Sequence, residues 1–100
     1  MIIVSQNKNE IVNFENMNNI IIENYDFKDK HFQRINAKTD GDYFVLGDYK
    51  TEERAKEVLK EIIQKSKDIS LANLMDNLQI AIHNKNFNGA LSSVYYMPED

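Results

Sequence analysis

The pattern of apolar and polar residues changes its period near residue 50. Before that point, short runs of β-branched and aromatic residues recur between polar turns, at 2–5, 10–14, 20–25, 31–38 and 43–49. Runs of this kind are typical of β-strands. After it, apolar residues return every three or four positions, which is the spacing of an amphipathic helix. The pattern therefore predicts a sheet followed by helices.

The polar segments between the runs indicate that neighbouring strands are antiparallel. Residues 6–9 suit a hairpin turn between the first two runs, and residues 26–30 form a charged loop before the fourth. Asp40-Gly41 predicts a further hairpin, because glycine tolerates the positive φ that a primed turn requires. We therefore expect an antiparallel β-meander of about five strands over residues 1–50.

The clearest helix start lies at Thr51. Its side chain can accept a hydrogen bond from the first turn, and Glu52 and Glu53 follow at the positive end of the helix dipole. This start predicts a helix from Thr51 to about Lys67 that crosses the apolar face of the meander. The apolar residues on its expected inner face are Ala55, Val58, Leu59, Ile62 and Ile63.

A second helix and a closing strand are expected after this helix. Ser70 suits a second N-cap, and helical spacing continues to about Asn84. Residues 91–97 are strand-like and Pro98 ends them, so this strand would add to an edge of the meander or to another protomer. The apolar residues of the second helix are Leu71, Leu74, Met75, Leu78 and Ile82.

Together these elements predict a single α+β domain over residues 1–100. Its expected parts are the β-meander at 1–50, two helices packed on or beside it at 51–84, and a short C-terminal strand at 91–97.

Charge and composition exclude several classes of partner. The net charge of −4 and a pI near 5.1 argue against a nucleic acid polymer, whose binders carry a basic stripe. The absence of cysteine excludes a disulfide framework and a thiolate metal site. No segment approaches the roughly 20 apolar residues of a membrane span, and the first residues lack a basic leader. We therefore expect a cytoplasmic protein without a membrane partner.

The sequence carries no clear catalytic pattern. Carboxylates are paired at 52–53 and at 40 and 42, where a helix cap and a turn favour acids for backbone reasons. His31 and His83 have no neighbours spaced as in a catalytic triad or a metal site, and the three glycines are isolated. We expect no enzyme activity, no catalytic residue, no metal ligand and no cofactor.

The aromatic residues suggest a binding site for a planar, anionic ligand. A ring would stack on a base, the scarce guanidinium of Arg34 would bind a phosphate, and amides would bind the base edge. Tyr95 and Tyr96 are adjacent, so in a strand only one can face the core, and the other is left for a ligand or for a dimer contact. The candidate ligand-binding residues are Phe32, Arg34, Asn36, Asn88, Tyr95 and Tyr96.

Four segments resemble small prophage proteins of low-GC Gram-positive bacteria: the opening Met-Ile-Ile-Val-Ser-Gln, residues 11–14, the phrase Leu-Gly-Asp-Tyr-Lys-Thr-Glu-Glu-Arg-Ala at 46–55, and residues 95–98. A meander followed by helices is similar to the Thoeris anti-defence sponges, which bind and sequester the cyclic ADP-ribose-type signal of TIR-domain immune proteins. The resemblance implies a phage-encoded, non-enzymatic nucleotide-binding protein that acts in the infected bacterial host. The resemblance does not align any binding residue of that family with a position in this sequence.

Two alternatives remain open at this point. One is a protein-directed inhibitor of a bacterial immune complex, similar to an anti-CRISPR protein, whose acidic surface occupies a nucleic-acid channel of a host immune protein. The other is a structural interaction protein. In each case we expect a homo-oligomer, at least a dimer, because the second helix and the terminal strand carry more apolar surface than one small sheet can cover.

Overall fold

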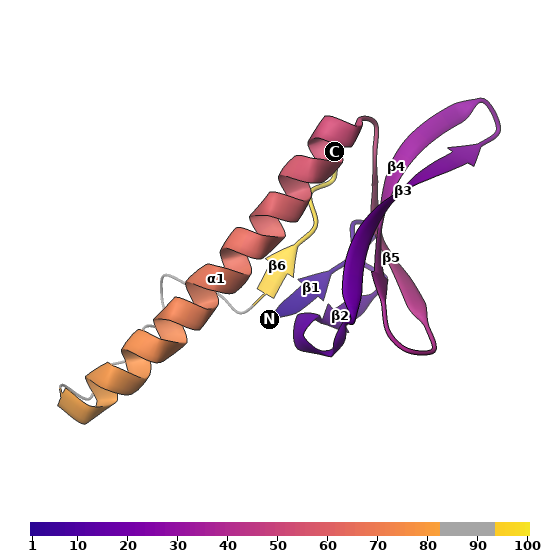
Figure 1. Cartoon of the computed structure of the whole chain (residues 1–100). Helices are drawn as coiled ribbons and strands as arrows, with labels where there is room; N and C mark the ends of the chain where they lie inside the picture. Colours follow the sequence, from indigo (N-terminus) through magenta and orange to yellow (C-terminus); the bar gives the residue numbers. More distant parts are fainter. Residues whose placement is uncertain (83–93) are drawn as a thin grey trace.

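The computed structural model describes the backbone of residues 1–82 and 94–100 and the side chains of residues 1–69 and 94–100. These residues form a small α+β fold with one long helix and two three-stranded sheets (Figure 1). The elements in chain order are β1 (Ile2–Val4), β2 (Ile11–Asn13), the 3-10 turn η1 (Phe14–Asn16), β3 (Asn19–Phe27), β4 (Lys30–Lys38), β5 (Tyr43–Tyr49), α1 (Glu52–Ile82) and β6 (Val94–Tyr96).

The predicted antiparallel meander is confirmed for three of its five expected strands, and the prediction that all five form one meander is wrong. Strands β3, β4 and β5 pair antiparallel in chain order. Strand β1 pairs antiparallel with β2 and parallel with β6, which makes a separate mixed sheet of order β2-β1-β6. The turn η1 separates the two sheets, because Asn13 caps it by accepting a hydrogen bond from the Glu15 N–H at 3.2 Å. The chain therefore leaves β2 through this turn instead of returning beside it.

The two hairpins of the meander differ from expectation in their turns. The predicted loop at 26–30 is mostly strand, and the turn that remains has Lys28 at a φ of 57°. In the β4–β5 turn, the Asp42 N–H donates to Thr39 Oγ1 at 3.1 Å and the Thr39 N–H donates to the Asp42 carbonyl at 2.8 Å. No glycine among the described residues has a positive φ, so that part of the prediction for Gly41 is wrong.

The helical part is one continuous helix of 31 residues, so the predicted pair of helices is wrong. The backbone stays helical through Ser70, where a second start was expected, because the expected joint at 66–69 holds no proline or glycine to end the helix. The predicted start is confirmed, since the Arg54 N–H donates to Thr51 Oγ1 at 3.1 Å. Among the described helical residues, no stretch combines the length and the apolar character that crossing a bilayer requires.

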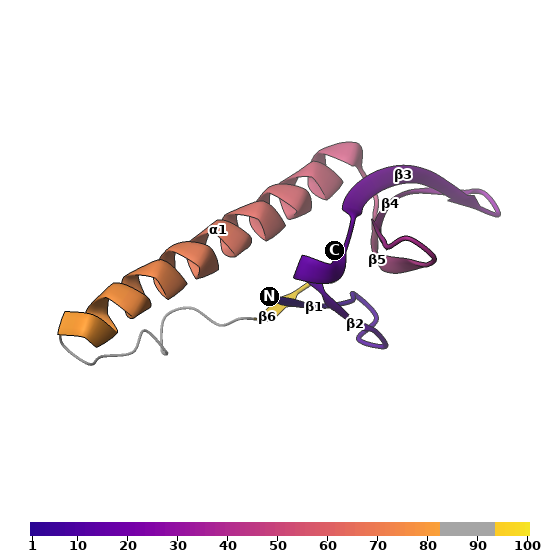
Figure 2. The ribbon, with the colours of Figure 1, turned by 60° about the horizontal axis from the view of Figure 1, so that its bottom comes forward.

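The core lies where the first half of α1 meets both sheets. Ala55, Val58 and Ile62 are buried as predicted, whereas Ile63 is 51% exposed. The second half of α1 extends beyond both sheets (Figures 1 and 2). The other buried apolar residues come from the two sheets and the C-terminal segment: Ile3, Val12, Ile35, Ala37, Leu46, Tyr49 and Met97.

Gln6 joins the two sheets to the segment that follows β6. Its backbone N–H donates to the Leu46 carbonyl at 2.7 Å, and its side-chain oxygen accepts from the Asp48 N–H at 2.9 Å. Its Nε2 donates to the carbonyls of Pro98 and Glu99 at 3.2 and 2.8 Å. One side chain thus bonds to β5 and to the chain after β6.

Candidate functional site

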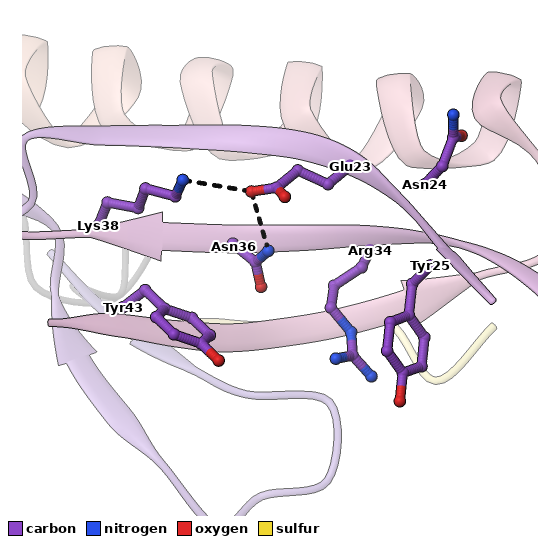
Figure 3. A pocket seen from close by; sticks show the side chains of 7 residues that line it. All are labelled: Glu23, Asn24, Tyr25, Arg34, Asn36, Lys38 and Tyr43. Atoms are coloured by element: carbon purple, nitrogen blue, oxygen red, sulfur yellow. Dashed lines mark hydrogen bonds and ion pairs between the residues drawn. The ribbon is translucent and has the colours of Figure 1, made fainter. Parts of the chain in front are cut away.

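The candidate site is a depression on the open face of the β3-β4-β5 meander. Alternation along β4 sends Ile35 and Ala37 into the core, and it sends Arg34, Asn36 and Lys38 to the opposite face. Figure 3 shows these side chains in front of the sheet, with α1 behind it. The depression has a volume of about 270 Å³. Its lining residues are Glu23, Asn24 and Tyr25 of β3, Arg34, Asn36 and Lys38 of β4, and Tyr43 of β5.

Arg34 is held in place on two sides. Its Nε and Nη2 donate to the Asp48 carboxylate at 2.7 and 3.0 Å. Its guanidinium carbon lies 3.5 Å from the centre of the Tyr25 ring, which is a stacked cation–π contact. The hydrogen bonds to Asp48 raise the pKa of Arg34, against the opposing effect of partial burial. The guanidinium is therefore a fixed cation whose Nε–Nη2 edge is already bonded to a carboxylate.

Asn36 is the buried polar group of the site, with 6% of its surface exposed. Its Nδ2 donates to Glu23 Oε1 at 3.3 Å, and because a carboxylate only accepts, this contact fixes which way the amide points. Its Oδ1 is directed toward the space between Tyr43 and Arg34 (Figure 3). This oxygen is buried and has no hydrogen-bond partner in the described part of the chain.

Glu23 receives a second donor beside Asn36. Lys38 Nζ lies 3.3 Å from Glu23 Oε1. The hydrogen bond from Asn36, followed by the contact with Lys38, lowers the pKa of Glu23. Each cation of the site thus has a carboxylate partner, Lys38 with Glu23 and Arg34 with Asp48. A phosphate entering this depression would compete with those carboxylates for their donors.

The structure brings together two of the six predicted ligand-binding residues, Arg34 and Asn36. Phe32 lines another depression, of about 490 Å³, beside Arg54. Asn88 lies outside the described residues. Phe32 therefore does not join Arg34 and Asn36 in this site as the sequence suggested.

Tyr95 and Tyr96 belong to β6, in the other sheet, and do not line the depression of Arg34 within one chain. The expectation that they point apart is confirmed, because Tyr95 packs against the core and Tyr96 is 65% exposed. The Tyr95 hydroxyl donates to Glu61 Oε2 at 2.7 Å. Burial is the main cause that raises the pKa of Tyr95, so its phenol stays neutral.

Sequence reasoning missed several residues of the site, and strand register is the signal that finds them. Pairing β3 with β4 through a turn at Lys28 places Tyr25 opposite Phe32 and Glu23 opposite Arg34. Residues two apart then share one face. The residues found in this way are Glu23, Tyr25, Lys38, Tyr43 and Asp48.

No group of three or more His, Asp or Glu side chains among the described residues is placed to hold a metal ion. No family model matches this chain, and neither does any curated protein or solved structure.

Proposed function

We propose that the protein is a non-enzymatic binding protein that holds a small nucleotide-derived ligand on the open face of the meander. The observation that carries this proposal is the meeting, in one depression, of Tyr43 with the stacked guanidinium of Arg34 and the unpartnered amide oxygen of Asn36. Tyr43 is 66% exposed, so its ring is available for stacking on a base. An amide oxygen can accept from a base edge beside it.

The biological role that we propose is sequestration of an immune signal of the cyclic ADP-ribose type by a phage-encoded counter-defence protein in the bacterial cytoplasm. The resemblance to Thoeris anti-defence sponges motivates this role. A ligand of that class offers an adenine ring for Tyr43 and phosphates near the cations Arg34 and Lys38. Sequestration requires tight binding and no bond cleavage, so the bound signal should survive unchanged.

The test is recovery of the ligand from the loaded protein. Purified protein is incubated with extract of cells whose TIR-domain immunity is active, washed and heat-denatured, and the released nucleotides are identified by mass spectrometry. An intact nucleotide in near-stoichiometric amount is expected. A cleaved product would indicate an enzyme instead, and the absence of any nucleotide would contradict the proposal.

Two exposed tyrosines provide a matched control. Tyr43 and Tyr96 are 66% and 65% exposed, and of the two only Tyr43 lines the depression. Tyr43→Ala should release much less nucleotide than the wild type, whereas Tyr96→Ala should release the same amount. Loss of ligand from Tyr96→Ala alone would contradict this site and favour one built on β6.

We also propose that the protein assembles at least as a dimer. The second half of α1 extends beyond both sheets, and its sequence carries the apolar residues Leu71, Leu74 and Leu78 at helical spacing. Pairing with a second copy would bury such a stripe, and two-fold symmetry is the commonest form. Light scattering at micromolar concentration tests this, and a monomeric mass would contradict it.

A second candidate function is inhibition of a host immune complex by direct protein contact. The observation that favours it is Phe27, which is 54% exposed near the turn of the β3–β4 hairpin, the end that reaches away from α1 in Figure 1. Exposed aromatics on a protruding element are frequent anchors of interfaces. Co-elution with an immune protein from a defended host, lost in Phe27→Ala and retained in Tyr43→Ala, would favour this function over nucleotide binding.

A further inference from the structure

Among the described residues, the amide oxygen of Asn36 is the only buried side-chain oxygen or nitrogen without a hydrogen-bond partner. It is buried in a side chain that is 6% exposed, and nothing described donates to it. Native proteins leave few buried acceptors without a donor. A ligand that supplies the donor would complete the network that already runs from Lys38 through Glu23 to the Asn36 amide.

The missing group is a donor and not an anion. Glu23 orients the amide so that its oxygen, and not its nitrogen, is the free end. An oxyanion placed there would face an acceptor on Asn36 and the nearby carboxylate of Glu23. Arg34 and Lys38 both have carboxylate partners, so neither leaves an unbalanced positive charge at this point.

The size of the depression limits what can enter. Its volume of about 270 Å³ lies just below the usual range of about 300–1,000 Å³ for ligand pockets, so it suits one planar part of a nucleotide better than the whole. The Asn36 oxygen is buried, so a neighbouring side chain must move before a ligand reaches it. Tyr43 is exposed and lines the same depression, so its ring offers the stacking surface for a planar group that reaches Asn36.

We propose that Asn36 selects nucleobases that carry an exocyclic amine, such as adenine, by accepting a hydrogen bond from that amine, while the phosphates lie at the rim of the depression, near Arg34 and Lys38 and away from the Asn36 oxygen. This inference rests on the proposed function and names the part of the ligand that the site recognises. The base stacks against Tyr43, and its N–H satisfies Oδ1. An oxo group at the same position would set acceptor against acceptor.

The experiment compares AMP with IMP by calorimetric titration of the full chain. The two probes share ribose and phosphate and differ only on the base edge: adenine has an exocyclic amine donor beside an N1 acceptor, whereas hypoxanthine has an oxo acceptor beside an N1–H donor. Wild type should bind AMP about tenfold more tightly than IMP, or better, as expected for one base-edge hydrogen bond replaced by a clash. Asn36→Leu should bring the two affinities within about twofold of each other.

Gln33→Leu is the matched control, because Gln33 lies on the same strand but does not line the depression, and its amide already donates to Asn24 Oδ1 at 2.7 Å. It should keep the preference for AMP. Equal binding of AMP and IMP by the wild type would overturn the role of Asn36 and leave the proposed function standing. Failure of both nucleotides to bind, together with no nucleotide recovered from cell extract, would contradict the proposed function itself. Because the first comparison uses wild-type protein, it does not depend on the folding of any variant.

Discussion

The two faces of strand β4 are both buried near its middle, yet their surroundings differ. Ile35 and Asn36 are neighbours with 0% and 6% of their surface exposed. Ile35 joins the apolar core with α1, whereas Asn36 joins a network of charged and amide groups. Burial of an apolar side chain stabilises the fold, while burial of a polar one stabilises it only when every partner is present. Stability should therefore depend on one face and recognition on the other.

The largest effect is expected on the core face. Ile35→Ala removes a fully buried side chain and should lower the free energy of unfolding by about 2–5 kcal/mol. Urea denaturation followed by circular dichroism measures this change. The folded fraction should still bind nucleotide with wild-type affinity, because Ile35 does not line the depression. A decrease in the free energy of unfolding of less than about 1 kcal/mol would contradict the expectation that this face determines stability.

The next effect concerns Arg34, whose side chain and that of its partner Asp48 are 21% and 28% exposed. Arg34→Ala leaves the Asp48 carboxylate without this partner and should cost about 1–2 kcal/mol of stability with the fold intact. It should also weaken nucleotide binding by about 1.5–3 kcal/mol, the range for a charged hydrogen bond. Arg34→Lys keeps the charge but loses the two-pronged contact, so its effects should be intermediate. Unchanged affinity in calorimetry would remove Arg34 from the site.

Tyr43→Ala should distinguish most clearly between the effect of β4's two faces on stability and their effect on nucleotide binding. Tyr43 is 66% exposed, so its truncation should change the free energy of unfolding by no more than about 0.5 kcal/mol. The same change should remove most of the nucleotide binding. Parallel urea and calorimetric measurements on one preparation test both statements. A stability loss as large as that of Ile35→Ala would mean that the open face also supports the core.

The smallest effect on stability is expected when the pH is lowered and Glu23 becomes protonated. The folded-state pKa of Glu23 is lowered, chiefly by the hydrogen bond from Asn36, so its contribution is present above the unfolded pKa of about 4.3 and is lost as the pH falls through the folded pKa. The difference in urea midpoint between wild type and Glu23→Gln should therefore narrow as the pH is lowered from 7 to below about 4. A difference that stays constant with pH would show that Glu23 is not held as described.

Local pattern was sufficient for the elements whose partners are close in sequence. The hairpins of β3, β4 and β5 follow from alternating runs between short turns, and the start of α1 follows from Thr51. The sequence also named Arg34 and Asn36 as candidate ligand-binding residues, and the structure brings these two together because residues two apart in a strand share one face. These predictions were confirmed because turns, strand alternation and helix caps depend on interactions between residues that are close in sequence.

Other features depend on contacts that no local pattern encodes. The parallel pairing of β1 with β6 joins residues 2–4 to residues 94–96. The partners of Arg34 come from two other strands, Tyr25 from β3 and Asp48 from β5, so they emerge only with the register of the whole sheet. The continuity of α1 was missed because Ser70 is a good cap that the surrounding helix overrides.

We expect the pairing of β1 with β6 to form late in folding. The entropy lost on closing a chain grows with the length of the loop, so contacts between neighbours in sequence form earlier than contacts that span nearly the whole chain. The β3–β4–β5 hairpins can form as soon as residues 19–49 exist, whereas β1 lacks its parallel neighbour until residues 94–96 have been synthesised. During synthesis, the meander that carries the candidate site could thus form while β1 still lacks its partner β6.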